Sequence, residues 1–480
     1  MSSISVGRKL EILSREDLYA IHQATIQVLE EIGIKSYSME ALKIFYEAGA
    51  NVDFKEKHIY IPEALLDMVK KAPSCFTVFA RNPKHNLEVG NDNVYYTPSS
   101  TLFFVFDLET GERRKATLRD CELLLKLNDA LPLIHGNACM VHPTDVPEHA
   151  AHVYMMLASI LNTSKTFRGR CRGKQVALDC IRMASILAGG MEELRKKPNL
   201  ITISNTVSPL ILEENQTEGL IEYARFGLPV GVSSEISAGG TGPITLAGSL
   251  VVQNAEVLSG IILTQLINPG TPVLYGTVAN IMDVRTGQMS LGSIEAGLLN
   301  VATAQLARYY NIPSRGSAGA TDSKVLDMCA GYETALNLIL ATMAGINYIH
   351  YCTGGMDLTL TASYEKTVID HEVLSEIYRI FRGIEVSEDS LALDAIRKVG
   401  PGGHFLSSKH TLTHLKIEQP TTILADRDRY ETWVKKGKMD IKTRAKARVL
   451  EILREHEVEQ LDKDVKAQLE KYVKDVVKRK

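Results

Sequence analysis

The sequence lacks any strong excess of charge. Its 480 residues carry 54 Lys and Arg against 57 Asp and Glu, which gives a formal net charge of −3. A protein that binds nucleic acid or an anionic membrane usually carries a basic excess. Its apolar content of 45% and charged content of 23% are ordinary for a soluble enzyme. The composition therefore favours a small-molecule site over a polyanion-binding surface.

Signals for export and for membrane insertion are also missing. The first residues, MSSISVGRKLEILSREDL, have no apolar core of the kind that signal peptides need. The longest apolar run, 246–266, is interrupted by polar residues such as Gln253 and Glu256, so no window of about 18 residues predicts a membrane span. The seven cysteines follow no framework spacing, which indicates a reducing cytoplasm.

Metal ligation has only one weak candidate. No CxxC or HxxxH pair occurs, and His135 and Cys139 alone have a spacing that suits a metal on a helix. Because the segment 133–141 has the pattern of a strand, we interpret His135 as a buried histidine with an ordinary hydrogen-bond partner. The sequence predicts no metal bound by this chain.

Short apolar strands alternate with amphipathic helices through the middle of the chain. Eight strands separated by helices, with a further long helix at 361–384, are typical of an α/β protein built as a (β/α)8 TIM-type barrel. The expected strands are 93–100, 133–141, 165–171, 200–209, 229–239, 271–279, 313–320 and 348–355.

The same pattern divides the chain into three regions. Residues 1–92 predict a mostly helical N-terminal layer, 93–385 the catalytic barrel, and 386–480 a largely helical C-terminal extension. The competing topology is a doubly wound sheet, which usually has a Gly-rich fingerprint after an early strand. The only comparable run, GGTGP at 239–243, follows the fifth strand and lacks an acidic partner downstream. The barrel is therefore favoured.

In a barrel, function lies at the carboxyl ends of the strands. Because strand side chains alternate with period two, the inward face of each strand end can be predicted. At the seventh strand this face carries Arg315, Ser317 and Gly319, which are a cation, a hydroxyl and a position without a side chain. No catalytic triad and no carboxylate pair appears among the strand ends. The other candidate site residues are Tyr96, Arg168, Arg170, Glu235, Tyr275 and His350.

These residue types suit a small zwitterion. An aromatic face attracts a methylated ammonium by about 0.5–2 kcal/mol, and arginine binds a carboxylate as a bidentate pair. We expect the carboxylate at Arg315 or at an arginine of the third strand, and the ammonium among Tyr96, Tyr275 and His350. His350 could instead hydrogen-bond the carboxylate. The alternative is that Glu235 and the arginines form a structural ion network inside the barrel.

Four longer segments resemble a known family. They are DLETGERRKAT (107–117), VHPTDVP (141–147), the run 239–276, and GATDSKVLDMCAGYE (319–333). Together they resemble the trimethylamine methyltransferase superfamily of corrinoid-dependent methyltransferases, most clearly over 90–375. In the trimethylamine enzymes a pyrrolysine stands just before an (S/T)-D-x-K segment. The run 321–324, TDSK, matches that segment, and Gly319 falls at the pyrrolysine position.

The chain is therefore similar to the non-pyrrolysine members of the family, which act on glycine betaine and related amines. The resemblance implies that it transfers a methyl group from glycine betaine to the Co(I) corrinoid of a separate corrinoid protein and releases dimethylglycine. This reaction belongs to one-carbon metabolism, methanogenic or acetogenic. Because a quaternary ammonium departs as a neutral amine, no general acid is needed, and the protein has to position the substrate and exclude water. Gly319 would leave room for the corrinoid or the substrate methyl group.

Several alternatives stay open from the sequence. The substrate could be proline betaine, carnitine, butyrobetaine or another methyl donor, such as a methyl ether or a methylated amino acid. The barrel could also bind betaine without catalysing its demethylation. The length of the chain and its apolar helices further suggest a homo-oligomer.

Overall fold

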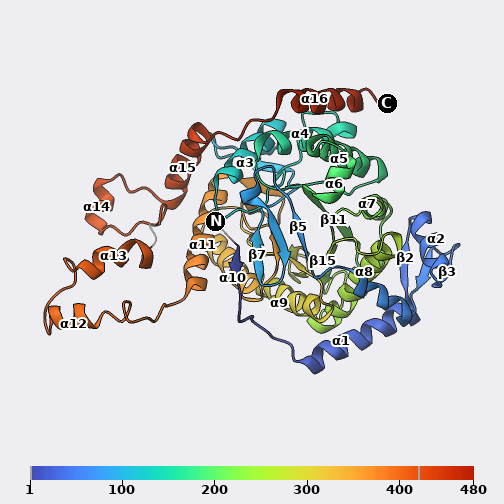
Figure 1. Ribbon diagram of the computed structural model, residues 1–480, viewed down its shortest axis with the longest axis horizontal. Coiled ribbons are helices and arrows are strands. Elements are labelled where there is room, and N and C mark those ends of the chain that lie inside the picture. Colours follow the sequence, from blue (N-terminus) through green and yellow to red (C-terminus); the bar gives the residue numbers. More distant parts are fainter. Residues whose placement is uncertain (1–2, 420–421, 480) are drawn as a thin grey trace.

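The computed structural model describes residues 3–419 and 422–479 and has a mixed α/β fold (Figure 1). Within these residues the central element is a curled eight-stranded sheet in the order β1-β7-β19-β18-β15-β13-β11-β10. Strand β1 joins β7 antiparallel, and the other pairings are parallel. The strands are β1 Ile4–Ser5, β7 Asn93–Tyr96, β10 Phe167–Arg168, β11 Leu200–Thr206, β13 Val230–Ser234, β15 Val273–Thr277, β18 Ser314–Ser317 and β19 Tyr348–His350.

Each helix that the sequence predicts between these strands is present and covers the outside of the sheet (Figure 1). Polar caps fix where the helices begin: Thr117 and Asp120 form a capping box at α3, and Asp327 caps α10. The covering helices are α3 Leu118–Ala130, α4 Ala151–Asn162, α5 Lys174–Ala188, α6 Met191–Lys196, α7 Glu214–Arg225, α8 Leu246–Ile267, α9 Ile294–Tyr309, α10 Met328–Met343 and α11 Tyr364–Arg382.

Helix α8 is the one helix in the described ranges that is long and apolar enough to cross a membrane. This differs from the prediction that no such window exists. In the fold, 72% of its most apolar window is buried, because the helix packs against β13, β15, α7 and α9. Its apolar character is that of a core helix lying under other elements.

The segment 133–141, predicted as the second strand, forms no regular strand. Its backbone nevertheless bonds to both neighbours of the expected position: His135 N–H donates to Tyr96 O at 2.9 Å, and Asn137 N–H donates to Thr166 O at 2.8 Å. Irregular bonds of this kind do not make a ladder. The curled parallel sheet is thus established, while a complete (β/α)8 barrel stays a prediction.

The register of the sheet shows which side chains point inward. One row of paired residues runs across five strands, from Asn205 through Ser233, Gly276 and Arg315 to Tyr348. Below this row the inner face is apolar, and a β5–β6 hairpin packs against it (β5 Cys75–Val78, β6 Leu87–Gly90). The apolar inner core consists of Val78, Leu87, Val89, Tyr95, Ile201, Ile203, Leu274 and Tyr348.

Residues before β7 mix helices with short strands, so the N-terminal layer is less helical than predicted. It contains α1 Arg15–Gln27, a π-helix Val28–Ile32, β2 Ile34–Ser36, α2 Met39–Glu47, β3 Asn51–Asp53, β4 His58–Tyr60 and a 3₁₀ helix Glu63–Lys71. A short strand, β12 Ile211–Leu212, joins this layer to the main fold through β2. The proposed boundary near residue 92 stays a prediction.

Short strands also decorate the loops at the carboxyl end of the sheet, which we call the mouth. Two small sheets stand there, one formed by β20, β21, β8 and β9 and the other by β14, β16 and β17. Their bounds are β8 Phe104–Phe106, β9 Arg113–Lys115, β14 Ser237–Ala238, β16 Asn280–Met282, β17 Met289–Ser290, β20 Gly355–Met356 and β21 Thr361–Ser363.

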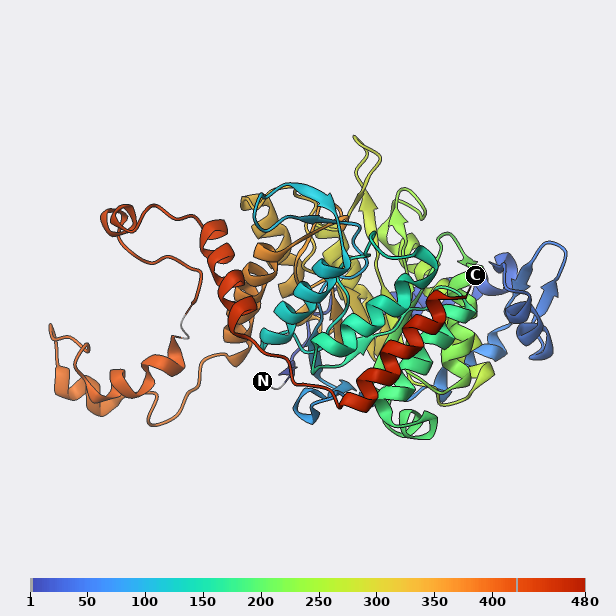
Figure 2. The same cartoon turned by 90° about the horizontal axis from the view of Figure 1, so that it is seen from above.

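The C-terminal extension is helical, as predicted, but its parts differ in their packing. Helix α15 packs on α11 and α3, and α16 packs on α4 and α5. Between α11 and α15 the chain makes an excursion away from the body, seen at the left of Figures 1 and 2. The helices of this region are α12 Leu393–Val399, α13 Lys409–Glu418, α14 Tyr430–Lys435, α15 Ile441–Glu455 and α16 Lys463–Val477.

Candidate functional site

Arg315 lies at the centre of a polar cluster on the inner face of the sheet. Its neighbour in the register is Gly276, where a Cβ would clash with Ser233 Oγ. Arg315 is only 1% exposed, and its Nη1 donates to the carbonyl of Thr277. Its Nε is buried without a hydrogen-bond partner. Burial lowers the pKa of Arg315 to about 10, but the side chain stays a cation with an unused donor.

Glu235 supplies the negative charge of the cluster. It follows directly after β13, and in the described part of the chain its carboxylate accepts a hydrogen bond from Asn205 Nδ2 alone. Burial raises the pKa of Glu235, and the charges of Arg315 and Arg168 partly offset this rise. The carboxylate is still reachable by solvent. Two neighbouring polar atoms, Asn205 Oδ1 and Ser233 Oγ, are buried without partners.

Arg168 and His350 form a fixed hydrogen-bonded pair. Arg168 Nη1 lies 2.8 Å from His350 Nε2 and donates to Ser100 Oγ at 2.7 Å. Since Nε2 accepts from a guanidinium, the His350 proton lies on Nδ1, 3.0 Å from Thr97 Oγ1. Burial and the two nearby arginines, Arg168 and Arg315, hold the pKa of His350 well below its usual range. Because both ring nitrogens are occupied by protein groups, His350 orients Arg168.

Arg170 lies further out, beyond the end of β10. Its Nη1 donates to Thr101 Oγ1 at 2.7 Å. Together with Arg168 it borders a small cavity of about 20 Å³ against the methionines of α4. Burial and the charge of Arg168 lower the pKa of Arg170. The two arginines of the third strand therefore stand side by side, with Arg168 nearer to Glu235.

Tyr351 belongs to the cluster although the strand alternation did not select it. Its backbone φ of 63° turns the chain out of the strand immediately after β19. The ring centroid lies 4.5 Å from that of His350. Burial raises the pKa of its hydroxyl, while Arg315 and Arg168 lower it. A left-handed backbone at a tyrosine is unusual and often marks a functional site.

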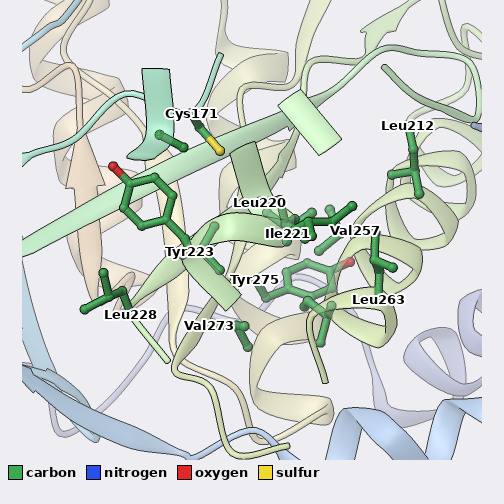
Figure 3. Packing of buried hydrophobic residues seen from close by; sticks show 14 of the residues in the cluster. Cys171, Leu212, Leu220, Ile221, Tyr223, Leu228, Val257, Leu263, Val273 and Tyr275 are labelled. Atoms are coloured by element: carbon green, nitrogen blue, oxygen red, sulfur yellow. The ribbon is translucent and has the colours of Figure 1, made fainter. Parts of the chain in front are cut away.

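Two of the predicted aromatic residues lie outside the cluster. The Tyr96 hydroxyl is hydrogen-bonded to Thr342 of α10 at 2.8 Å, and the Tyr275 hydroxyl donates to Asn254 of α8 at 2.8 Å. Figure 3 shows Tyr275 in the buried cluster that also contains Val257 of α8. Both rings thus fill the layer between sheet and helices, and their hydroxyls bond to helix residues and not to the Arg315 cluster.

The backbone around Gly319 leaves no space for a ligand at that residue. A Cβ built there would lie 2.9 Å from the carbonyl oxygens of Tyr351 and Cys352, and the φ of +101° disfavours any other residue. The Gly319 carbonyl accepts from Lys366 Nζ at 2.8 Å, and Lys366 is also paired with Asp370. The expectation that Gly319 opens space is therefore incorrect: the loop after β19 packs directly on it.

The sequence predictions for the site thus divide into two groups. Arg168, Arg315, Glu235 and His350 come together on the inner face, and Arg170 lies beside them. Asn205 and Tyr351 were missed. Within the described ranges no group of three or more His, Cys, Asp or Glu side chains could hold a metal ion.

A curled parallel sheet whose carboxyl end carries incompletely paired charged groups defines an α/β enzyme with a small-molecule site. Sequence comparison identifies the family within this class. The profile of the trimethylamine methyltransferase (MTTB) family matches residues 3–480, and the chain belongs to this family.

Individual relatives agree with this assignment. The chain is 40% identical over 467 residues to the glycine betaine methyltransferase of Desulfitobacterium hafniense, with 97% of each chain covered. It is 37% identical to the trimethylamine methyltransferase MttB of the same species, over 98% of this chain and 94% of the relative. The crystal structure of the monomethylamine methyltransferase of Methanosarcina barkeri has a similar fold, with a TM-score of 0.54, 12% identity, and coverage of 98% and 90%. The chain is accordingly a methyltransferase.

Proposed function

We propose that this enzyme transfers a methyl group from glycine betaine, or a closely related betaine, to the Co(I) corrinoid of a partner protein. The observation that carries the proposal is the buried Arg315 guanidinium with an unused Nε donor, in the electrostatic range of Glu235. A zwitterion matches both groups, because its carboxylate satisfies the arginine and its ammonium faces the glutamate.

The partly satisfied polar groups support a ligand over a closed structural network. In a structural network we expect each buried donor and acceptor to be paired. Here Arg315 Nε, Asn205 Oδ1 and Ser233 Oγ are buried and unpaired. We infer that the substrate carboxylate binds Arg315, and that the methylated nitrogen lies between Glu235 and the ring of Tyr351.

The chemistry asks little of the protein beyond this placement. The methyl carbon would be taken up by the Co(I) corrinoid of the partner protein, and the electron pair of the broken C–N bond stays on nitrogen, so dimethylglycine leaves with a neutral amine and its carboxylate charge. No proton is transferred, which agrees with a neutral His350 fixed by Thr97 and Arg168. The chain's own residues bind the substrate, orient it and exclude water.

The mouth supports the idea of a protein carrier for the corrinoid. Its loops expose large apolar side chains that no other element of the described chain covers. We infer that the corrinoid protein docks there and brings cobalt to the substrate methyl group. We further propose that the segment 133–141 completes a (β/α)8 barrel around this entrance. The exposed apolar side chains are Phe103, Ile244, Val284, Met289, Val325 and Leu360.

The preference for a quaternary amine rests on Gly319. At the position where the family resemblance expects pyrrolysine, the backbone has room for glycine alone. We therefore propose a donor that needs no activating side chain, which favours glycine betaine over trimethylamine. Proline betaine and carnitine are the alternatives within this class.

We place the reaction in the cytoplasm, in agreement with the free thiols of all seven cysteines.

Calorimetric titration tests the binding half of this proposal. Glycine betaine should bind, whereas trimethylamine, which lacks the carboxylate, and acetate, which lacks the cation, should bind at least tenfold more weakly. Proline betaine and carnitine in the same series would rank the alternative substrates. Equal affinity for glycine betaine and trimethylamine would refute the assignment of Arg315 to the carboxylate.

A further inference from the structure

The excursion between α11 and α15 forms an arm that its own chain leaves uncovered. We define the arm as 384–419 and 422–440. Helices α12, α13 and α14 bury no residue, and Figure 2 shows the arm standing off from the body. These helices have 7, 10 and 6 residues, whereas isolated helices shorter than about 12–15 residues are marginal in water. The arm therefore needs a surface to pack on.

Apolar side chains are numerous on the arm. Leu406 is 81% exposed and Leu412 is 69% exposed, values that a soluble surface rarely shows for several large residues in one segment. The spacing in α12 and α13 gathers these residues on helix faces. The exposed ones on and around α12 and α13 include Ile384, Val386, Leu393, Ile396, Phe405, Leu406, Leu412 and Leu415.

The base of the arm is held firmly, so the apolar faces have a defined position. Glu418 at the end of α13 pairs with Arg379 at 2.8 Å and with Arg382 at 3.1 Å, both on α11. Where the arm returns, Leu424 is 2% exposed, and its N–H donates to Glu372 at 3.0 Å. The arm is thus tied to the body near its middle, at Glu418 and Leu424, and this limits where its apolar side chains are presented.

A matching apolar stripe lies on the body next to the arm. Helix α10 exposes Tyr332, Leu336 and Met343, and their spacing of four and seven residues puts all three on one helix face. Helix α10 packs beside α11, from which the arm departs, and Ile380 of α11 is exposed as well. Arm and stripe therefore occur together on every copy of the chain.

We propose that two copies of this chain exchange their arms, each arm packing on the α10 stripe of its partner. Such a contact is reciprocal and closes as a two-fold dimer. A large aliphatic side chain has about 60–120 Å² of apolar surface to bury, so at their exposed fractions the arm and stripe residues offer on the order of 400–800 Å², which approaches the roughly 800 Å² per partner of a stable interface. The arm starts at the end of α11 opposite the mouth, because α11 begins directly after the mouth strand β21 and runs away from it. The arm is thus attached away from the mouth, and the mass of the dimer can be measured independently of the reaction.

Light scattering coupled to gel filtration tests the exchange with the full chain. The wild type should have at least twice the mass of the 53.0 kDa chain. The double variant Leu412→Asp/Leu415→Asp on the arm and the double variant Tyr332→Asp/Leu336→Asp on the stripe should each shift it to 53.0 kDa. Circular dichroism should show both variants folded. The matched control is Tyr19→Asp on α1, a residue that is 57% exposed and should leave the mass unchanged.

Photo-crosslinking then distinguishes exchange from packing on the arm's own body. Benzoylphenylalanine at position 412 of an isotopically heavy chain, mixed with a light chain, should crosslink to light α10 peptides. A monomeric wild type, an assembly that survives both double variants, or crosslinks confined to heavy peptides would each overturn the proposal.

Discussion

Glu235 and Glu256 are two carboxylates beside the same strands, yet the Glu235 side chain is accessible to solvent and the Glu256 side chain is not. Glu256 of α8 is 1% exposed and accepts hydrogen bonds from Thr206, Ser208 and Ser234 and from the N–H of Leu210, at 2.6–2.9 Å. Glu235 accepts one hydrogen bond and lies near two arginines instead. Burial raises the pKa of both.

The number of hydrogen bonds that each carboxylate accepts distinguishes a structural carboxylate from a ligand-binding one in this fold. A carboxylate whose oxygens are all occupied has no capacity left for a ligand, and it holds the surrounding backbone in place. A carboxylate with free capacity beside an incompletely paired arginine is arranged for something that comes from outside. The polar cluster on the inner face and the layer between sheet and helices therefore have different roles, which substitutions should distinguish.

The largest effect on betaine affinity is expected at Arg315, the centre of the polar cluster. Arg315→Met removes the carboxylate partner, which should weaken glycine betaine binding by ~2 kcal/mol or more, about 30-fold. Calorimetry measures this, and Arg315→Lys should recover only part of the affinity because it lacks the planar fork. Arg182→Met, an exposed arginine on α5, is the matched control. An unchanged betaine affinity in Arg315→Met would contradict a binding role for the polar cluster as distinct from the layer between sheet and helices.

The counterpart in the outer layer should act on stability. Glu256→Gln loses the charge that four donors share, and some of these buried donors lose their partners. The free energy of unfolding should fall by about 2–3 kcal/mol, measured by urea denaturation, while betaine affinity of the folded protein changes far less. Glu192→Gln at an exposed helical ion pair should change neither. A Glu256 variant with full stability would contradict the structural role.

Glu235→Gln should have the inverse profile, with affinity reduced about 5- to 30-fold and stability preserved. The same residue predicts a pH dependence. Because its pKa is raised above 4.5, its charge is lost as the pH falls through that raised value, and betaine binding weakens there. In Glu235→Gln, the betaine affinity measured across this pH range should no longer fall toward acid pH. A fall that persists in the variant would assign the titration to another group.

The smallest effects are expected from a pair of tyrosines. Tyr351→Leu removes an aromatic face from the Arg315 cluster and should reduce betaine affinity about 2- to 30-fold. Tyr275→Phe removes the hydrogen bond to Asn254 and should lower stability by about 1 kcal/mol with no change in binding. If Tyr275→Phe changed affinity and Tyr351→Leu did not, the assignment of the two tyrosines to their regions would be reversed.

These tyrosines also show where prediction from sequence stops. The positions of the helices follow from apolar periodicity and caps, and the inward placement of Arg168, Glu235 and Arg315 follows from strand alternation. Tyr96 and Tyr275 were predicted to face inward but face the helices, because a buried tyrosine can face outward when a helix supplies a partner for its hydroxyl, as Thr342 and Asn254 do. Tyr351 was missed since its left-handed φ breaks the alternation. Gly319 was recognised as special, but only the packing of the loop on its Cα shows why.

Methyl transfer from glycine betaine can be measured with the purified proteins. The chain is mixed with glycine betaine and a reduced Co(I) corrinoid protein, and the corrinoid spectrum and dimethylglycine are followed together. The account predicts one methyl-Co(III) formed for each dimethylglycine released, with trimethylamine inactive. Transfer from trimethylamine in preference to glycine betaine, or tight betaine binding without transfer to any corrinoid protein, would contradict it.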